Sequence, residues 1–482
     1  PNWSDPDPAL FYRRNYRNIA NGRHPRRNDV MRIDGNLSSR LNVFWRWIND
    51  YDMQENFGTT PYELSNAQGQ RSTFYQDHPN PGKGHGIGIT YTISPTMVNE
   101  FNFGKSYNTW SWYIHDESQV LRARMNNPPH WFNEKDPNFV NDLNLARPSL
   151  GPGSQNYAIY VPQVSFGGGS TVGQASFTQA RPYTNWNDIY SFSDSFSVVR
   201  GKHSLKTGFY YERTGKVQQG GSGAYLGSYN FASTANNPND TGNGYANAFL
   251  GNFQTYSEGQ RVIGDFWFTN IEIYAQDSWR IHPRLTLELG IRLYHMKPQE
   301  NLNNLSAAFW LPSYDPQKVP RLYRPGLDAN GRQVAVDPVT GRSTFAALQG
   351  TFVPCSAGGY ATCPNYANGM EVAGVSDKIP LSVFQPPRLA PTVRIGFAWD
   401  VFGNGKTAIR GGFGQFFNRG DGNQIHNMNG NAPVTQTSTL FYSQINSVAA
   451  QTGGGAVTPP SPSYIVGKHD YEGLMNGSFG IQ

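Results

Sequence analysis

The run from residue 285 to residue 293 constrains this chain more than any other feature. Its apolar side chains occupy every second position, at Leu285, Leu287, Leu289, Ile291 and Leu293. Threonine, glutamate, glycine and arginine fill the positions between them. A helix would scatter these apolar side chains around its circumference, whereas a strand collects them on one side. The run therefore predicts a β-strand with one apolar face and one polar face.

Similar alternation recurs along the chain in pairs of segments separated by short turns. We expect strand hairpins at about residues 30–49, 86–107, 189–212, 266–295 and 393–418, with a half-hairpin at 477–482. The connections between hairpins are roughly 35 to 95 residues long, whereas ordinary hairpin loops have about two to five. In outer-membrane barrels the periplasmic turns are short and the extracellular loops are long. The asymmetry predicts an all-β fold, an antiparallel transmembrane β-barrel with long, irregular extracellular loops.

Composition agrees with this fold class. Only 15% of residues are charged, against about a quarter in soluble proteins, while 14% are aromatic. The expected strands of about eight to thirteen residues match the roughly nine to eleven needed to cross a bilayer at a tilt. Lysine and arginine form no basic run, so nucleic-acid binding is not expected. The alternative fold is a soluble β-sandwich with an aromatic core, although sandwich loops are usually short.

The alternation assigns side chains to the two faces of the wall. Residues expected to face lipid, or to form its aromatic belt near strand ends, are Trp45, Trp47, Trp279, Leu285, Leu287, Leu289, Ile291, Leu293, Phe397 and Trp399. Residues expected to face the lumen are Glu272, Gln276, Glu288, Arg292, Arg394 and Arg410. The lumen-facing set could hold a plug or line a solute path, or could simply be the wet face of the wall.

Other residues give no sign of catalysis. No nucleophile motif is present, and the polar stretch 200–203 falls at an expected periplasmic turn, so we expect no enzyme. The stretches 328–331 and 237–243 resemble calcium loops only faintly, and an Asx turn is the expected structure for both. We therefore expect no metal and no cofactor. Cys355 and Cys363 lie close together without a histidine or a second cysteine pair, which favours a disulfide over a metal site.

Five stretches in succession resemble conserved blocks of the Oar-like branch of TonB-dependent receptors. They are SPTMVNEF at 94–101, DSFS with RGKHSLKTG within 194–208, GNGYANAFLG at 242–251, YAQDSWR with RLTLELGIR within 274–292, and PTVRIGFA with GKT and RGGFG within 391–414. The resemblance implies a barrel of about 22 strands, of which this chain supplies the central part, about eleven strands. Family members also carry a plug domain and a segment that contacts TonB, neither of which is in this sequence.

The implied function is transport or reception of a bulky solute, bound by the extracellular loops and moved through a plugged barrel. The implied partners are outer-membrane lipid, the TonB complex through a segment not present here, an unknown bulky solute and other envelope proteins; the location is the outer membrane of a Gram-negative-type bacterium. One alternative is a non-transporting surface protein that displays its loops for adhesion or assembly. Another is a soluble secreted β-protein that assembles with copies of itself, and a remote one is an outer-membrane hydrolase.

Overall fold

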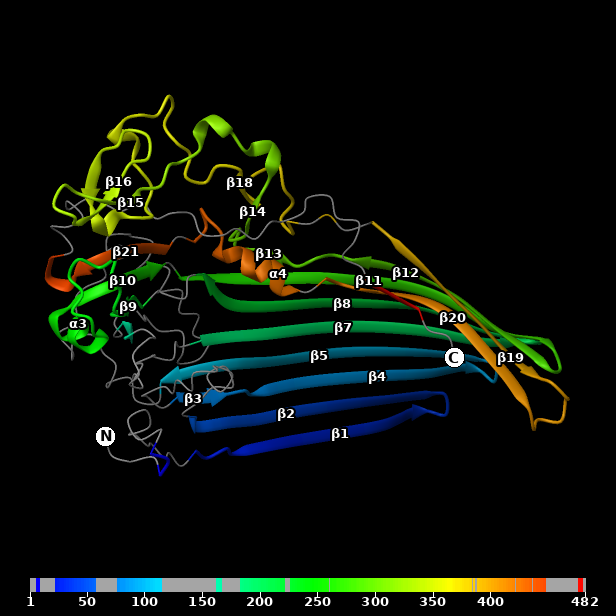
Figure 1. The fold of residues 1–482 in the computed structure, drawn as a ribbon. Coiled ribbons are helices and arrows are strands. Elements are labelled where there is room, and N and C mark those ends of the chain that lie inside the picture. Colours follow the sequence, from blue (N-terminus) through cyan, green and yellow to red (C-terminus); the bar gives the residue numbers. More distant parts are fainter. Residues whose placement is uncertain are drawn as a thin grey trace.

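The structure is a computed structural model that describes twelve segments of the chain: residues 6–8, 22–57, 76–114, 162–166, 183–221, 226–259, 261–383, 385, 388–420, 422–435, 437–447 and 476–479. Long antiparallel strands run the length of the molecule, with tight turns at one end and folded loops at the other (Figure 1). Among the described residues, no helix is both long enough and apolar enough to span a membrane.

One 13-stranded sheet forms the wall. Without the short β3 (Gln76–Pro79) and β13 (Glu300–Asn301), its strands in order are β1 (Arg26–Ser38), β2 (Leu41–Phe57), β4 (Gly82–Ser94), β5 (Met97–Ile114), β7 (Tyr183–Arg200), β8 (His203–Gly221), β11 (Arg261–His282), β12 (Leu285–Met296), β19 (Ala390–Asp400), β20 (Ala408–Asn418) and β22 (Asn476–Phe479). Neighbours in this order pair antiparallel. The sheet does not close within the described part of the chain, where β1 and β22 are its two ends.

The hairpins lie where the alternation places them, but most are longer on the loop side. β11 has 22 residues and β8 has 19, beyond the expected thirteen. β2 runs to Phe57 rather than to Asn49, so Trp45 and Trp47 lie in its first half and not near its end as expected. The alternation is lost where polar side chains line both faces, which hid these extensions. Of the half-hairpin, only 476–479 is described, as β22; residues 480–482 lie outside the described residues.

Successive hairpins are staggered along the strand direction. Trp45, four residues from the start of β2, pairs with Ile87, seven residues from the end of β4. Tyr211, eight residues into β8, pairs with Ile271, eleven residues from the end of β11. The displacement is three residues at these two junctions, two between β5 and β7 and one between β12 and β19, or roughly one residue per strand on average. An average of roughly one residue per strand tilts the strands by about 35°, the tilt of membrane barrels.

The strand register separates two faces. The odd-numbered positions of β11 and β12 bring Ile273 opposite Leu293 and Trp279 opposite Leu287. Their side chains stay uncovered by the rest of the chain: Ile273 is 53% exposed and Ile291 is 48% exposed. Inward packing of these rows, as in a soluble sandwich, is not observed. We call this surface the outer face of the wall.

The opposite, inner face is polar, rich in glycine and partly covered by chain. The ring of Phe44 in β2 lies directly against Gly88 in β4, where any Cβ atom would collide with it. Near the loop end, α4 (Gly422–Asn427) packs on β8, and His426 lies 2.9 Å from the amide nitrogen of Gln218. The chain that follows β20 therefore folds back over the inner face.

The sequence predicts irregular long connections, but the structure differs. The described parts of these connections are folded into a cap. Its elements are a four-stranded sheet of β21 (Thr437–Gln444), β10 (Asn252–Gly259), β9 (Ser228–Asn230) and β6 (Gln163–Ser165), a three-stranded sheet of β15 (Arg324–Leu327), β16 (Gln333–Val336) and β17 (Ser343–Phe345), the pair β14 (Ala307–Phe309) and β18 (Met370–Val372), and α3 (Gly244–Leu250). Aromatic side chains from two connections, Phe166, Tyr229, Phe253 and Tyr256 among them, share one core with Leu440 from a third connection. Burial of these rings orders loops that sequence periodicity alone does not predict.

Candidate functional site

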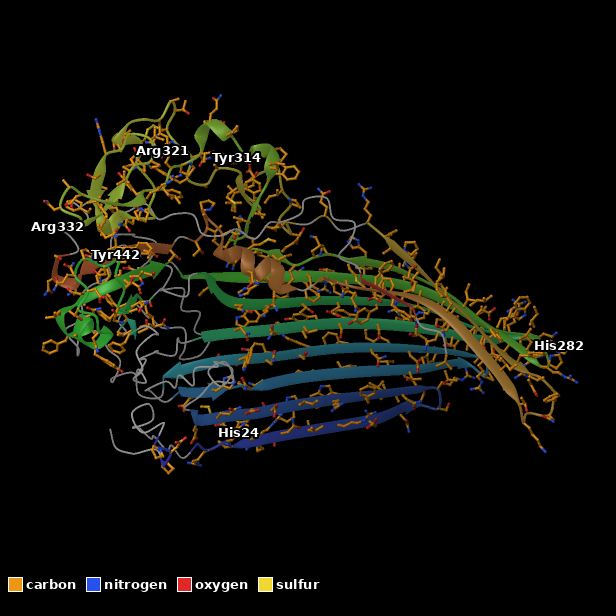
Figure 2. All side chains as sticks on the ribbon, in the orientation of Figure 1. His24, His282, Tyr314, Arg321, Arg332 and Tyr442 are labelled. Carbon is orange, nitrogen blue, oxygen red and sulfur yellow. A yellow bond between two sulfur atoms is a disulfide. The ribbon has the colours of Figure 1, made fainter. Side chains whose placement is uncertain are left out.

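The cap contains a cavity between two parts that are distant in sequence. Its volume is about 760 Å³, within the range of sites for small ligands. One wall comes from the stretch around β15 and the other from β21. Figure 2 shows Arg321 and Arg332 in the upper part of the cap, Tyr442 below them, and His282 at the turn end of the wall. The cavity is therefore on the loop side of the barrel.

Two adjacent rings of β21 line this cavity together. Consecutive residues of a regular strand point to opposite faces, yet Phe441 and Tyr442 both line the cavity, with ring centroids 5.8 Å apart. The backbone of Tyr442 has φ 52°, a left-handed conformation that is strained for an aromatic residue. The strain turns two rings toward one space. Strained residues of this kind concentrate at functional sites.

The opposite wall presents apolar and cationic groups. Leu322 is 42% exposed and Val339 is 63% exposed, and both line the cavity beside exposed Arg324. Within the described part of the chain Arg324 has no ion-pair partner, so its guanidinium group is available to an anionic or carbonyl-bearing ligand. The cavity can therefore hold a largely apolar molecule that carries a hydrogen-bond acceptor.

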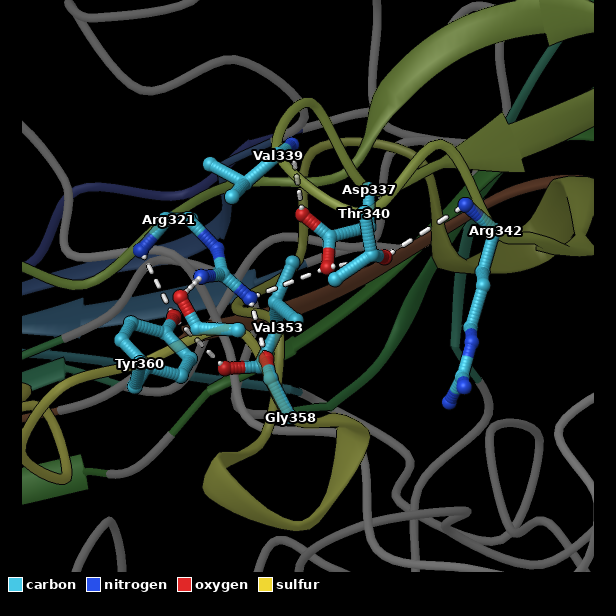
Figure 3. A network of polar contacts seen from close by, with 9 residues as sticks. Arg321, Asp337, Val339, Thr340, Arg342, Val353, Gly358 and Tyr360 are labelled. Atoms are coloured by element: carbon cyan, nitrogen blue, oxygen red, sulfur yellow. Dashed lines mark hydrogen bonds and ion pairs between the residues drawn. The ribbon is translucent and has the colours of Figure 1, made fainter.

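Arg321 also lines the cavity and anchors this wall to the rest of the cap. Its guanidinium group donates to Asp337 at 2.9 Å and to the carbonyl oxygen of Gly358 at 2.7 Å, and it lies 3.8 Å from the ring centre of Tyr360 (Figure 3). The Tyr360 hydroxyl in turn donates to the carbonyl oxygen of Val353 at 2.9 Å. The ion pair is buried, with side-chain exposures of 12% for arginine and 2% for aspartate. It ties three stretches of the cap into one frame.

Asp337 depends on its hydrogen bonds to remain charged in this frame. Burial by itself would raise the pKa of Asp337. The Val339 backbone N–H at 3.0 Å, the Thr340 hydroxyl at 2.7 Å and the charge of Arg321 more than offset that effect and hold the pKa of the carboxyl below its usual range. The anion is therefore the stable form at neutral pH.

A disulfide joins Cys355 to Cys363, with Cα atoms 5.2 Å apart. It closes the short segment whose Gly358 carbonyl accepts from Arg321. The stretch 328–331 forms an Asx turn, in which the Asp328 side chain accepts from the backbone of Asn330 at 2.8 Å. Asn237 accepts likewise from the backbone of Asn239 at 3.0 Å. Among the described residues, no group of three or more potential ligands could hold a metal ion.

The six lumen-facing candidates share the inner face of four neighbouring strands. Arg292 in β12 forms an ion pair with Glu272 in β11, and the Ser278 hydroxyl donates to Glu288 at 2.6 Å. The strand register places the rest on the same face, through the pairs Gln276–Gly290, Gly290–Arg394 and Ala398–Arg410. The side chains therefore form one polar surface rather than a closed site.

The lipid-facing candidates share the outer face. Leu285 pairs with Trp399, Leu287 with Phe397 and Leu289 with Ile395. Trp279 stacks on His203 at the turn end, with ring centroids 5.3 Å apart. Sequence reasoning missed the cap cavity, because its two walls are more than a hundred residues apart; the one available signal was the Tyr and Pro content of the long loops.

Comparison with known protein families agrees with this architecture. A family model described as "Outer membrane beta barrel domain" matches residues 1–472. No curated protein matches the chain. Among solved structures, the ferric citrate transporter FecA in its unliganded form has 8% identity and a TM-score of 0.36, with 84% of this chain and 38% of that chain covered. The copper transporter OprC has 8% identity and a TM-score of 0.35, with coverages of 83% and 38%.

The siderophore receptor PiuA from Acinetobacter baumannii has 9% identity and a TM-score of 0.33, with coverages of 83% and 43%. The chain thus spans less than half the length of these structures. The family match covers nearly the whole chain and agrees with the exposed apolar rows and the alternation of turns and loops. The chain belongs to the family of outer membrane beta barrel domains, and its place is the outer membrane of a Gram-negative bacterium.

Proposed function

We propose that this chain is part of an Oar-like, TonB-dependent receptor that captures a bulky solute in its cap and passes it into the barrel. The cap cavity is the observation that carries the proposal. A protein that used its loops only for adhesion would gain nothing from a strained backbone that aims two rings into one concave space. A polar inner wall beneath the cap suits onward passage of a solute with polar groups.

The proposed solute is largely apolar, with an anionic or carbonyl group for Arg324. The rings of Phe441 and Tyr442 would contact its apolar body, and the guanidinium group would fix its orientation. TonB would supply the energy through a segment outside this chain. The barrel wall itself carries no proposed catalytic role.

The test compares solute depletion from growth medium by cells that express the full-length protein. Tyr442→Gly removes one ring, and glycine adopts a left-handed backbone without strain, so the fold is retained. Arg332→Gln is the matched control, because this exposed arginine lies in the same sheet region but does not line the cavity.

We expect mass spectrometry of the medium to identify solutes that wild-type cells deplete and cells lacking the protein do not. Depletion should require TonB, persist in Arg332→Gln and fall at least about tenfold in Tyr442→Gly, the change expected for loss of a central aromatic contact. Depletion without TonB, or equal depletion by Tyr442→Gly, would contradict the proposal. If cells lacking the protein lose adhesion but deplete the same solutes as wild-type cells, the chain would instead be part of a surface protein.

A further inference from the structure

The outer face changes character between two neighbouring rows of residues that pair across the strands. One row of paired residues crosses six strands and is wholly apolar or aromatic: Trp45, Ile87, Phe103, Phe192, Tyr211 and Ile271. The next row toward the cap crosses the same sheet as Trp47, His85, Lys105, Tyr190 and Arg213. A shift of two residues therefore replaces an apolar or aromatic side chain with a permanent cation on β5 and β8 and with histidine on β4, while Trp47, Tyr190 and Thr269 occupy the other three strands.

The row beyond it adds a further cation. Lys83 pairs with Tyr107, which pairs with Asp188. We call Lys83, His85, Lys105 and Arg213 the basic belt. Lys83, His85 and Arg213 are exposed, and the Lys105 side chain is 40% exposed. These residues come from β4, β5 and β8, so the belt is a property of the assembled sheet and not of any sequence run.

The distance of the belt from the turn end of the wall matches the height of the apolar band of a membrane barrel. His203, which stacks on Trp279, marks the turn end of the outer face, and Arg213 lies ten residues further along β8. At about 3.3 Å per residue and a tilt of about 35°, the two are about 27 Å apart along the barrel axis. The apolar band of outer-membrane barrels is about 25 Å tall. By the same measure Lys105, eight residues from the start of β5, and Lys83, eleven residues from the end of β4, are about 22 and 30 Å from their turns. The belt therefore straddles the outer edge of the hydrocarbon, near the depth of lipid phosphates.

The cations of the belt contact aromatic rings and one carboxylate. The Lys105 ammonium lies 4.6 Å from the ring centre of Tyr190, and the Arg213 guanidinium lies 5.0 Å from the ring centre of Trp267. Asp188 is 4.0 Å from Lys105 and also accepts from the Tyr190 hydroxyl at 3.0 Å. Three permanent cations thus share one nearby carboxylate, which leaves a net positive surface.

We propose that the basic belt binds the phosphate groups of an outer-leaflet lipid. The proposed ligand is a lipid with two phosphates on one headgroup, because the cations span the four strands β4, β5, β7 and β8, three strand steps or about 14 Å at roughly 4.8 Å per step. Lys83 and Lys105 supply ammonium groups for one phosphate, and Arg213 supplies a bidentate guanidinium for the other. The acyl chains lie along the apolar row beneath. The binding anchors the wall at a fixed depth and is independent of transport.

The test uses the full-length protein in detergent and native mass spectrometry with diphosphoryl lipid A as the probe. Monophosphoryl lipid A is the matched lipid. The test variant combines Lys83→Gln, Lys105→Gln and Arg213→Gln. The control variant combines Arg200→Gln, Lys202→Gln and Lys406→Gln, which remove the same charge from exposed residues at the turn end. Heat-modifiable migration in gels shows that each variant is folded.

We expect wild type and the control variant to retain diphosphoryl lipid A at least about fivefold better than the belt variant, with the monophosphoryl lipid bound less well by wild type. The belt variant should no longer distinguish the two lipids. Equal retention by wild type and the belt variant, or equal binding of both lipids by wild type, would overturn the proposal. Displacement of the lipid by inorganic phosphate at tens of millimolar would assign the belt to soluble phosphate and overturn the lipid assignment.

Discussion

Ile273 offers a direct test of which solvent the outer face contacts. Trp267 and Trp279 lie on the same face of β11, each six residues from Ile273. The side chain of Ile273 is 53% exposed, so the rest of the chain does not cover it. At about 3.3 Å per residue and a tilt of about 35°, each ring is about 16 Å from Ile273 along the barrel axis. Ile273 is therefore at the middle of the apolar band.

In lipid, Ile273→Arg places a guanidinium group at the bilayer midplane, which costs about 2–4 kcal/mol in a barrel wall. In water the same exposed position would tolerate arginine within about 0.5 kcal/mol. Ser278→Arg is the control, because Ser278 is on the inner face next to Glu288. We expect it to change the free energy of unfolding by less than about 1 kcal/mol.

The assay is reversible folding of the full-length protein into lipid vesicles, followed through a guanidinium titration. For Ile273→Arg we expect the free energy of unfolding to fall by about 2–4 kcal/mol. For Ser278→Arg we expect a much smaller change. A change below about 0.5 kcal/mol for Ile273→Arg would refute the assignment of this face to lipid.

Two further predictions concern the inner face and the cap. Gly88→Ala should destabilise the wall by about 1–3 kcal/mol, because the added methyl collides with the Phe44 ring, while Gly86→Ala, which meets open space, should not; guanidinium unfolding measures both. The pKa of Asp337 is below its usual range in the folded protein. The ionised carboxylate therefore stabilises the cap fully at pH values above the unfolded-state pKa of about 4. This stabilisation is lost as the pH falls further and the carboxyl of the folded protein is protonated. Asp337→Asn should therefore lower the unfolding temperature of the cap at neutral pH by calorimetry, with the difference from wild type shrinking toward about pH 3; a constant difference would contradict the role of its pairing with Arg321.

The wall could be predicted from sequence because the alternation of apolar and polar side chains can be recognised within a single strand. A strand between lipid and a wet interior needs apolar side chains at every second position, and Leu285 to Leu293 meet that need without help from distant residues. The same rule fails at the loop ends of β8 and β11, where neither face contacts lipid. There the strand continues through backbone pairing, such as Thr214 with Phe268, which leaves no periodic signal.

The cap could not be predicted, because its order comes from contacts between distant loops. Phe166, Tyr256 and Leu440 pack in one core although they come from separate connections. The cavity wall at Tyr442 depends on a backbone angle that no sequence motif indicates. The disulfide between Cys355 and Cys363 was predictable, because two nearby cysteines in one loop offer few alternatives.

Spin-label accessibility along β12 tests the central claim most directly. Single labels would replace each residue from Thr286 to Leu293 in the full-length protein in lipid vesicles, and collisions with oxygen, which concentrates in hydrocarbon, would be compared with collisions with a water-soluble nickel chelate. We expect oxygen contact to peak at Leu287, Leu289 and Ile291 and to fall at the positions between them, because the outer face touches lipid. Accessibility to the nickel chelate that is high on both faces would contradict a membrane wall.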